Sequence, residues 1–182
     1  MMRHILFFIL LLFFCAGQVA GQQQWQEFKS YEGRFSVLAP GAFQQQVDSI
    51  ETPVGRLAYH VFFYQPETKD SADNLIYMIS YCDYPPFSLD ADSADLLNEF
   101  FEATIESAVE SVDGELAYAS DRPYFRYPGR IWRINYLNGQ ALIKTRALVA
   151  GNRYYALQTA TVKNRSLNPA SDRFLDSFRL LE

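Results

Sequence analysis

The chain has 182 residues, and its 16 lysines and arginines stand against 21 aspartates and glutamates, for a formal net charge of −5. An acidic balance argues against nucleic acid as a partner, because proteins that bind it carry a basic surface. Fifteen phenylalanines, 12 tyrosines and two tryptophans supply enough apolar surface for a core that needs no disulfides.

The first residues are typical of a secretory signal peptide. Arg3 precedes an unbroken apolar run at 5–14, and small residues follow at 19–21. The run is much shorter than the about 20 residues that span a bilayer. We therefore predict that residues 1–21 are removed, that the protein is periplasmic or secreted, and that it has no membrane span. A lipid anchor at Cys15 is disfavoured, because two phenylalanines stand where a lipoprotein peptidase requires small side chains.

Removal of this leader would leave residues 22–182, which we predict to be a single domain with Cys82 as its one thiol and His60 as its one imidazole. A disulfide, a paired-cysteine redox centre and a zinc site of several His and Cys ligands are then excluded within one chain. A hydrolase would have to use His60, with Cys82 as nucleophile and Asp83 as orienting acid. The alternative is a half-buried histidine and an inert core cysteine. We predict no cofactor and no metal.

The first half of this chain reads as strands separated by turns. Strands are predicted at 25–29, 34–39, 43–50, 56–65 and 75–82, with turn residues at 31–33, 52–55 and 84–86. The last of these strands is the most apolar, and we expect it to be central in a sheet.

One long helix follows. Its N-cap is predicted at Asp90, Asp92 or Ser93, and Asp113-Gly114 ends it. Apolar residues recur at helical spacing, namely Leu97, Phe101, Ile105, Ala108 and Val112. The acids at 90–95 begin like a calcium loop but lack its sixth-position glycine, so capping is the favoured interpretation.

The second half returns to strands, predicted at 115–125, 130–137, 140–149 and 153–162. Asn138-Gly139 is a strong hairpin signal, because both turn positions need a positive φ. Asn168-Pro169 begins a closing helix with Phe174, Phe178 and Leu181 as its apolar contacts. The whole pattern predicts an α+β fold, an antiparallel sheet of hairpins packed by the central and C-terminal helices.

Four segments resemble a group of exported, uncharacterised bacterial proteins: EGRFSVLAP, GRIWRINY, RALVAGNRYYALQTATV and RFLDSFRLL. The architecture of that group is similar to the PsbP family and to the Ran-binding Mog-type proteins, a sheet sandwiched by helices. The resemblance therefore implies a fold and identifies no catalytic residue. Relatives with this fold mostly act as binding or accessory subunits, which is an analogy of fold.

Charge is divided along the chain. Residues 22–119 carry 4 basic and 17 acidic side chains, whereas residues 120–182 carry 11 basic and 4 acidic ones. The acids of the predicted central helix fall on one face, at Asp95, Glu99, Glu102, Glu106 and Glu110. Like charges at this spacing cost an isolated helix about 0.2–0.5 kcal/mol per pair.

The basic half also has a geometry. A two-residue turn at 138–139 places Arg133 opposite Lys144 and Ile131 opposite Arg146, so the three cations share one face of the sheet. Three explanations compete. Both charged faces are ordinary solvated surfaces; or the basic face is covered internally, by the acidic helix or by acids such as Asp48 and Glu51; or a charged face docks an oppositely charged partner.

Residues 121–130 form an aromatic and arginine-rich loop of the kind that suits an interface or a groove. Rim packing of a tyrosine-rich sheet is the alternative. We predict a non-enzymatic binding or accessory module of the bacterial envelope that contacts a protein partner. Its predicted surface consists of Arg122, Tyr124, Arg126, Tyr127, Arg130, Arg133, Lys144 and Arg146. The alternatives are a carrier of a small apolar or anionic ligand, and a hydrolase that uses His60.

Overall fold

A computed structural model describes residues 25–69, 72–89 and 93–181. The predicted signal peptide, Cys15 and the acids at 90–92 lie outside these residues. The secondary structure elements are β1 (Gln26–Ser30), β2 (Phe35–Ala39), β3 (Gln44–Thr52), β4 (Gly55–Tyr64), β5 (Ile76–Asp83), α1 (Ala94–Ser111), β6 (Glu115–Asp121), β7 (Gly129–Tyr136), β8 (Ala141–Ala150), β9 (Arg153–Val162), the 3-10 helix η1 (Lys163–Arg165), α2 (Pro169–Asp176) and β10 (Arg179–Leu180).

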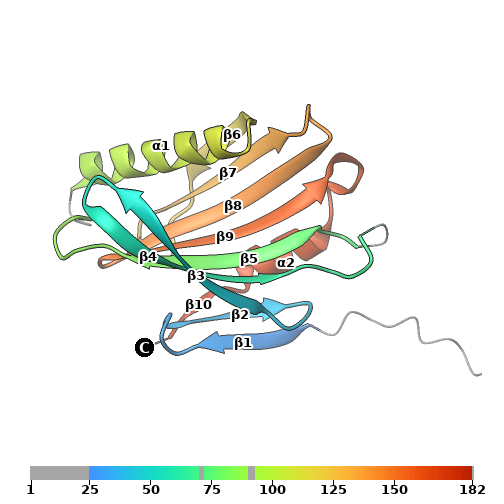
Figure 1. Ribbon diagram of the computed structural model, residues 1–182, viewed down its shortest axis with the longest axis horizontal. Helices are drawn as coiled ribbons and strands as arrows, with labels where there is room; N and C mark the ends of the chain where they lie inside the picture. Colours follow the sequence, from blue (N-terminus) through green and yellow to red (C-terminus); the bar gives the residue numbers. More distant parts are fainter. Residues whose placement is uncertain (1–24, 70–71, 90–92, 182) are drawn as a thin grey trace, which may run out of the picture.

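The strands form two antiparallel sheets. The larger sheet has the order β3-β4-β5-β9-β8-β7-β6, and the smaller has the order β1-β2-β10. Strand β5 lies between β4 and β9, so the prediction of a central strand at 75–82 is confirmed. Figure 1 shows α1 on one side of the larger sheet and the smaller sheet on the other. The predicted α+β class, with one long central and one C-terminal helix, is confirmed.

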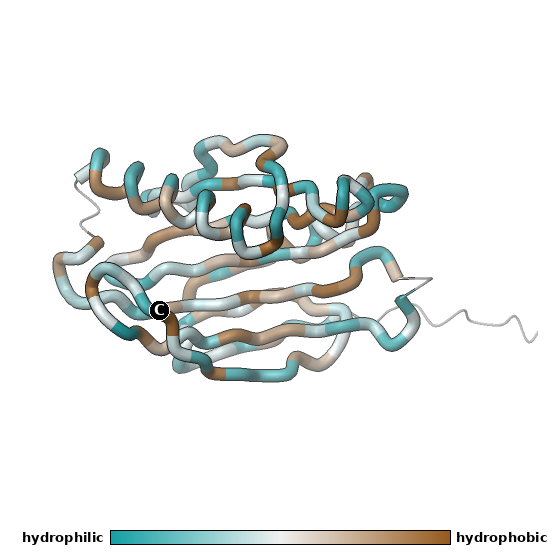
Figure 2. Tube along the Cα trace, turned by 45° about the horizontal axis from the view of Figure 1, so that its top comes forward, coloured by the Kyte–Doolittle hydropathy of each residue, from teal (hydrophilic) through white to brown (hydrophobic). Residues whose placement is uncertain are grey.

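The two faces of the larger sheet carry separate cores. On one face, Leu97, Phe101 and Ile105 of α1 pack against Trp132 and Ala147. These helical residues recur at a spacing of four, which places them on one side of the helix. Figure 2 shows hydrophilic and hydrophobic residues alternating along α1, as expected of a helix with one face exposed to solvent.

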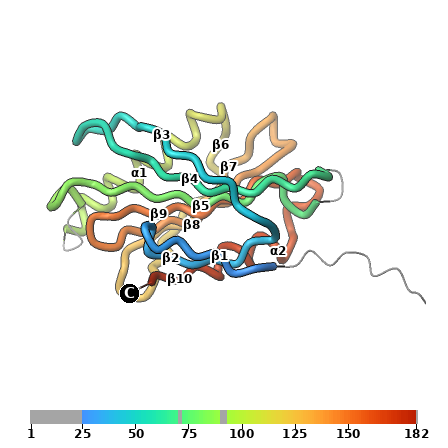
Figure 3. The backbone as a smooth tube through the Cα atoms, turned by 60° about the horizontal axis from the view of Figure 1, so that its bottom comes forward, coloured from blue at the N-terminus to red at the C-terminus, as the bar shows by residue number. Residues whose placement is uncertain are grey.

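The second core is mainly aromatic and lies under α2 and the smaller sheet. Phe35 of β2 packs against Phe62, Tyr155 and Phe178, with ring centroids 5.6, 6.3 and 6.2 Å away. Phe174 of α2 is fully buried in the same cluster. These ring contacts hold the smaller sheet against the larger one. Figure 3 shows β1, β2 and β10 together along one side of the larger sheet.

Two local predictions are confirmed in detail. Asn138 and Gly139 have φ angles of 53° and 75°, and Leu137 before them also has a positive φ of 51°. The side chain of Asn168 accepts a hydrogen bond of 2.9 Å from the backbone N–H of Ser171, and it therefore caps α2.

The ends of two elements differ from the predictions. Strand β6 ends at Asp121, four residues early. Helix α2 ends at Asp176, so Phe178 and Leu181 lie beyond it. There the Ser177 hydroxyl accepts a hydrogen bond of 2.9 Å from the backbone N–H of Leu38, and the chain continues as β10 beside β2. Such long-range pairing has no local sequence signal.

Candidate functional site

The geometry separates the two residues of the predicted Cys-His pair. In the register of β4 and β5, Cys82 is opposite Tyr59, and His60 is opposite Tyr81. Because adjacent side chains on a strand point to opposite faces, His60 and Cys82 lie on opposite sides of the sheet. A catalytic dyad of the two is therefore ruled out.

The side chains of His60 and Cys82 each pack against neighbouring residues. The His60 ring stacks on the Tyr81 ring with centroids 4.4 Å apart, and its Nδ1 is buried without a hydrogen-bond partner among the described residues. Cys82 is buried, and its burial raises the pKa of the thiol to about 11. A thiol with such a pKa is protonated at neutral pH and is a poor nucleophile.

The predicted basic sheet face exists, with Arg133 opposite Lys144 and Ile131 opposite Arg146. Most of its charge is neutralised within the fold. Lys144 forms an ion pair with Asp172, and Arg146 Nη1 lies 2.8 Å from Asp176 Oδ1. Both acids belong to α2, which covers this face.

The internal-cover explanation therefore holds, but with other acids than those predicted. Helix α1 packs on the opposite face of the sheet and cannot reach these cations. Asp48 instead accepts a hydrogen bond from Gln46, and Glu51 pairs with Arg56. The face on which each helix packs is set by long-range contacts, which is why the sequence pattern named the wrong acids.

The remaining predicted surface residues do not form one continuous face. Arg130 points to the α1 side, where it donates a hydrogen bond of 2.6 Å to Asn98 and pairs with Asp121. Arg133 lies on the other side, with its guanidinium 5.8 Å from the centroid of the Tyr118 ring. Arg122 is exposed at the start of the loop before β7.

Tyr124, Arg126 and Tyr127, in contrast, line a pocket of about 830 Å³. We call the end of the molecule around it the loop end, which comprises the connections 31–34, 84–89, 122–128 and 151–152. The other lining residues are Arg34, Asp83, Phe125, Ala150, Gly151, Asn152, Arg153, Tyr155, Leu180 and Leu181. Figure 3 shows the β6–β7 loop, the β8–β9 turn and the C-terminal strand at this same end.

Arg153 connects separate segments of the loop end through its side chain. Its Nε and Nη2 each donate a hydrogen bond of 2.6 Å to the two oxygens of Asp83, and its Nη1 donates to the carbonyl oxygen of Glu32. The guanidinium also lies 4.5 Å from the centroid of the Tyr81 ring. Because these contacts use all three nitrogens, Arg153 positions the loops and has little left to offer a ligand.

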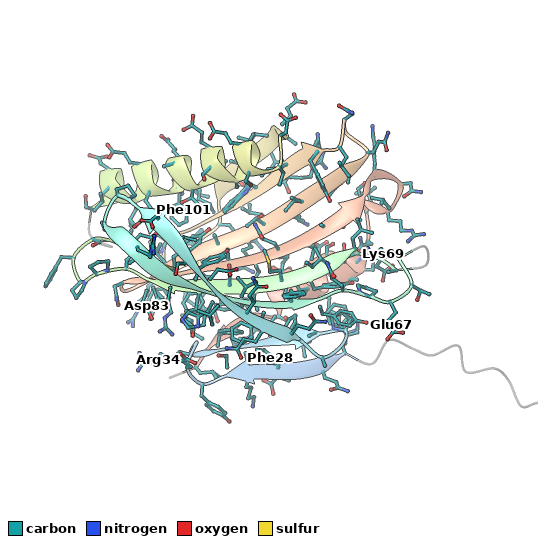
Figure 4. The ribbon with its side chains drawn as sticks, in the orientation of Figure 1. Phe28, Arg34, Glu67, Lys69, Asp83 and Phe101 are labelled. Carbon is teal, nitrogen blue, oxygen red and sulfur yellow. The ribbon has the colours of Figure 1, made fainter. Side chains whose placement is uncertain are left out.

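Arg34 and Arg126 are the cations of the pocket without an acidic partner among the described residues. Arg126 donates a hydrogen bond of 3.2 Å to the Tyr127 hydroxyl, and its guanidinium lies 5.2 Å from that ring. Arg34 follows the β1–β2 turn with a positive φ of 54°. Figure 4 shows Arg34 and Asp83 at one end of the molecule and Lys69 at the other.

Sequence reasoning missed the exposed aromatic rings of the loop end. Tyr31, Phe87 and Phe125 are 82%, 95% and 85% exposed and belong to three different connections. Phe87 and Phe125 also have positive φ angles of 67° and 51°, which bulky residues rarely adopt. Only Phe125 lay within the predicted aromatic loop, since exposure and convergence depend on the tertiary fold.

Two further features concern metal binding and membranes. Within the described ranges, no three His, Cys, Asp or Glu side chains gather closely enough to hold a metal ion. No helix in those ranges combines the length and apolar character needed to cross a membrane.

Comparison with known proteins identifies the fold. No protein-family model and no curated protein sequence matches this chain. The solution structure of cyanobacterial PsbP (CyanoP) from Synechocystis sp. PCC 6803 matches 89% of this chain and 95% of its own, with a TM-score of 0.58 and 14% identity. A crystal structure of PA94 from Pseudomonas aeruginosa, a putative regulator of unknown function, matches 78% of this chain and 85% of its own, with a TM-score of 0.37 and 9% identity. The fold is PsbP-like, as the sequence segments implied.

Proposed function

We propose that this PsbP-like protein is an exported, non-enzymatic binding or accessory module that contacts an acidic protein partner of the bacterial envelope through its loop end. Export rests on the predicted signal peptide at 1–21. The fold supports the accessory role by analogy, because PsbP-like proteins are typically non-catalytic binding modules.

The main support for the proposal is a set of exposed aromatic rings that lie on separate loops of the loop end. Tyr31, Phe87 and Phe125 each leave more than four fifths of their surface in water. Tyrosine and phenylalanine are enriched in the buried centres of protein interfaces. The left-handed backbone at Phe87 and Phe125 costs about 1–2 kcal/mol at each residue, which a purely structural loop would avoid.

Charge at the same end favours an acidic partner. Asp83 is neutralised by Arg153, and Asp121 by Arg130. Arg34, Arg122 and Arg126 have no acidic partner among the described residues. They outnumber Glu32, the one acid in the connections of the loop end, so this end is basic on balance. Opposite charge on a partner would steer its approach and orient it, an effect that salt weakens.

A hydrolytic role has less support. It would need a nucleophile and an orienting acid beside His60, and the thiol of Cys82 lies on the other face of the sheet. The half-buried ring of His60 stacks on Tyr81, which belongs to the core beneath the smaller sheet.

Immobilised protein tests the proposal against envelope proteins of the source organism at low and high salt. We expect a specific set of retained proteins that decreases as salt rises and is lost in the double variant Arg34→Gln/Arg126→Gln. The control Lys69→Gln/Lys163→Gln removes the same charge at the opposite end and should retain the set. The proposal is contradicted if the amount of retained protein does not change with salt concentration, or if both double variants lose the retained set equally.

A further inference from the structure

The residues that line the pocket of the loop end indicate which class of ligand it binds. Its volume of about 830 Å³ lies in the range of small-molecule sites, about 300–1,000 Å³. We propose that it binds an aromatic or other apolar group that bears a carboxylate. The inference deepens the proposed function, on which it rests for the identity of the binding end.

The apolar walls of the pocket are held in place by contacts with the core and the backbone. Tyr124 is only 9% exposed, and its ring packs edge-on against Phe178 with centroids 5.4 Å apart. The Tyr155 hydroxyl donates a hydrogen bond of 2.8 Å to the carbonyl oxygen of Gly33, which fixes the ring. Leu180 closes the wall from β10. Walls that are already ordered lose little conformational entropy when a ring binds between them.

The charge of the pocket selects an anion. Its charged lining residues are three arginines and one aspartate. Arg153 neutralises the aspartate through two hydrogen bonds of 2.6 Å. Arg34 and Arg126 remain, and neither has an acidic partner among the described residues. The Arg126 side chain is steadied by its contact with Tyr127, so its charge is held at the pocket rim. A guanidinium group suits a planar carboxylate because it can donate two parallel hydrogen bonds.

A carboxylate fits better than a free phosphate for two reasons. The described lining residues include none from the first turn of α1 or α2, where backbone N–H groups would usually bind phosphate. The aromatic and leucine walls would also stay wet around a small inorganic ion, whereas an attached ring would cover them.

Two probes that share one ring system, one of them anionic and the other neutral, test this inference. We expect 2-naphthoate to shift the NMR signals of residues 124–127 and 153–155, and to bind about tenfold more tightly than neutral 2-naphthamide, the effect of one charge-assisted hydrogen bond. Arg34→Gln and Arg126→Gln should each reduce that preference, and Lys69→Gln/Lys163→Gln should keep it. Equal binding of the two probes, or no binding of 2-naphthoate, overturns the inference.

A second pair of probes identifies the source of the carboxylate. A short glycine peptide that ends in phenylalanine should bind with a free carboxylate and not as its amide, if the end of a partner chain fills the pocket. Binding of 2-naphthoate without either peptide would assign the pocket to a free small molecule of the same chemistry. Loss of envelope partners in the loop-end variants without 2-naphthoate binding would leave the proposed function standing and remove this inference alone.

Discussion

Arg146 and Asp176 join helix α2 to the larger sheet, with Nη1 and Oδ1 2.8 Å apart. The Arg146 side chain is 12% exposed, donates also to the carbonyl oxygen of Leu175, and lies over the Tyr124 ring. The pair therefore connects the closing helix to the loop that lines the pocket. In this protein a basic sheet face serves first to hold its own helix.

We expect Asp176→Asn to lower the free energy of unfolding by about 1–3 kcal/mol, because it leaves the largely buried guanidinium of Arg146 without its anion. Asp172→Asn is the matched control on the same helix. Its partner Lys144 is 25% exposed, so water replaces the lost contact and the cost should stay below about 1 kcal/mol. Urea denaturation of both variants measures the difference, and equal costs would contradict the assigned role of Arg146.

The thiol of Cys82 should be inert in the folded protein. It is 1% exposed, and burial raises its pKa to about 11. Alkylation by iodoacetamide at pH 8 should therefore be slow without denaturant and rapid in urea. Rapid alkylation of native protein would show that Cys82 is not buried as described.

Alkaline pH should unfold the protein. Burial raises the pKa values of Tyr77, Tyr81 and Tyr84 to about 12, above the ordinary value of about 10. Because the unfolded chain loses these protons first, the stability that they contribute is complete below pH of about 10 and is lost as pH rises towards about 12. Tyrosinate absorbance and circular dichroism should change together in this window. Ionisation of all tyrosines near pH 10 with the fold intact would refute the assignment.

The two helix starts should respond differently to substitution. Asn168 caps α2 through Ser171 and also donates to the carbonyl oxygen of Arg165, so Asn168→Ala should cost about 1–2 kcal/mol of unfolding free energy. Ser93 stands at the N-cap of α1 without a side-chain hydrogen bond. Ser93→Ala should therefore change the thermal midpoint little, and a larger effect there than at Asn168 would contradict these caps.

The exposed ring of Phe87 should reduce stability while it supports binding. Phe87→Gly relieves the positive φ of 67° and should raise the free energy of unfolding by about 0.5–1 kcal/mol. Phe87→Ala removes the same ring but keeps the strained Cβ, so it should bring no such gain. Both variants should retain less of the envelope partner. Unchanged retention in both would exclude Phe87 from the contact surface.

Local sequence signals predicted most of the fold. The hairpin at Asn138-Gly139 fixed the register that sets Arg133 opposite Lys144, because its turn geometry depends on two adjacent residues. The cap at Asn168 is equally local. The pairing of β10 with β2 was not predictable in this way, since the two strands are far apart in the chain and β10 has only two residues.

The candidate site was predictable only in part. Tyr124, Arg126 and Tyr127 were found because aromatic and arginine residues cluster in one loop. Arg34 and Phe87 were missed, because their convergence at one end depends on the tertiary fold, for which there is no local sequence signal. Charge pattern alone could not separate Lys144, which pairs with Asp172, from Arg126, which has no acidic partner in the described part of the chain, since the pairing of Lys144 depends on which face α2 covers.

Hydrogen exchange of the protein with and without its retained partner tests the central claim most directly. Residues 31–34, 84–89, 122–128 and 151–153 should gain protection on binding, whereas α1 and its acidic face at Glu99 to Glu110 should exchange as before. Protection confined to α1, with the loop end unchanged, would contradict the assignment of the contact surface.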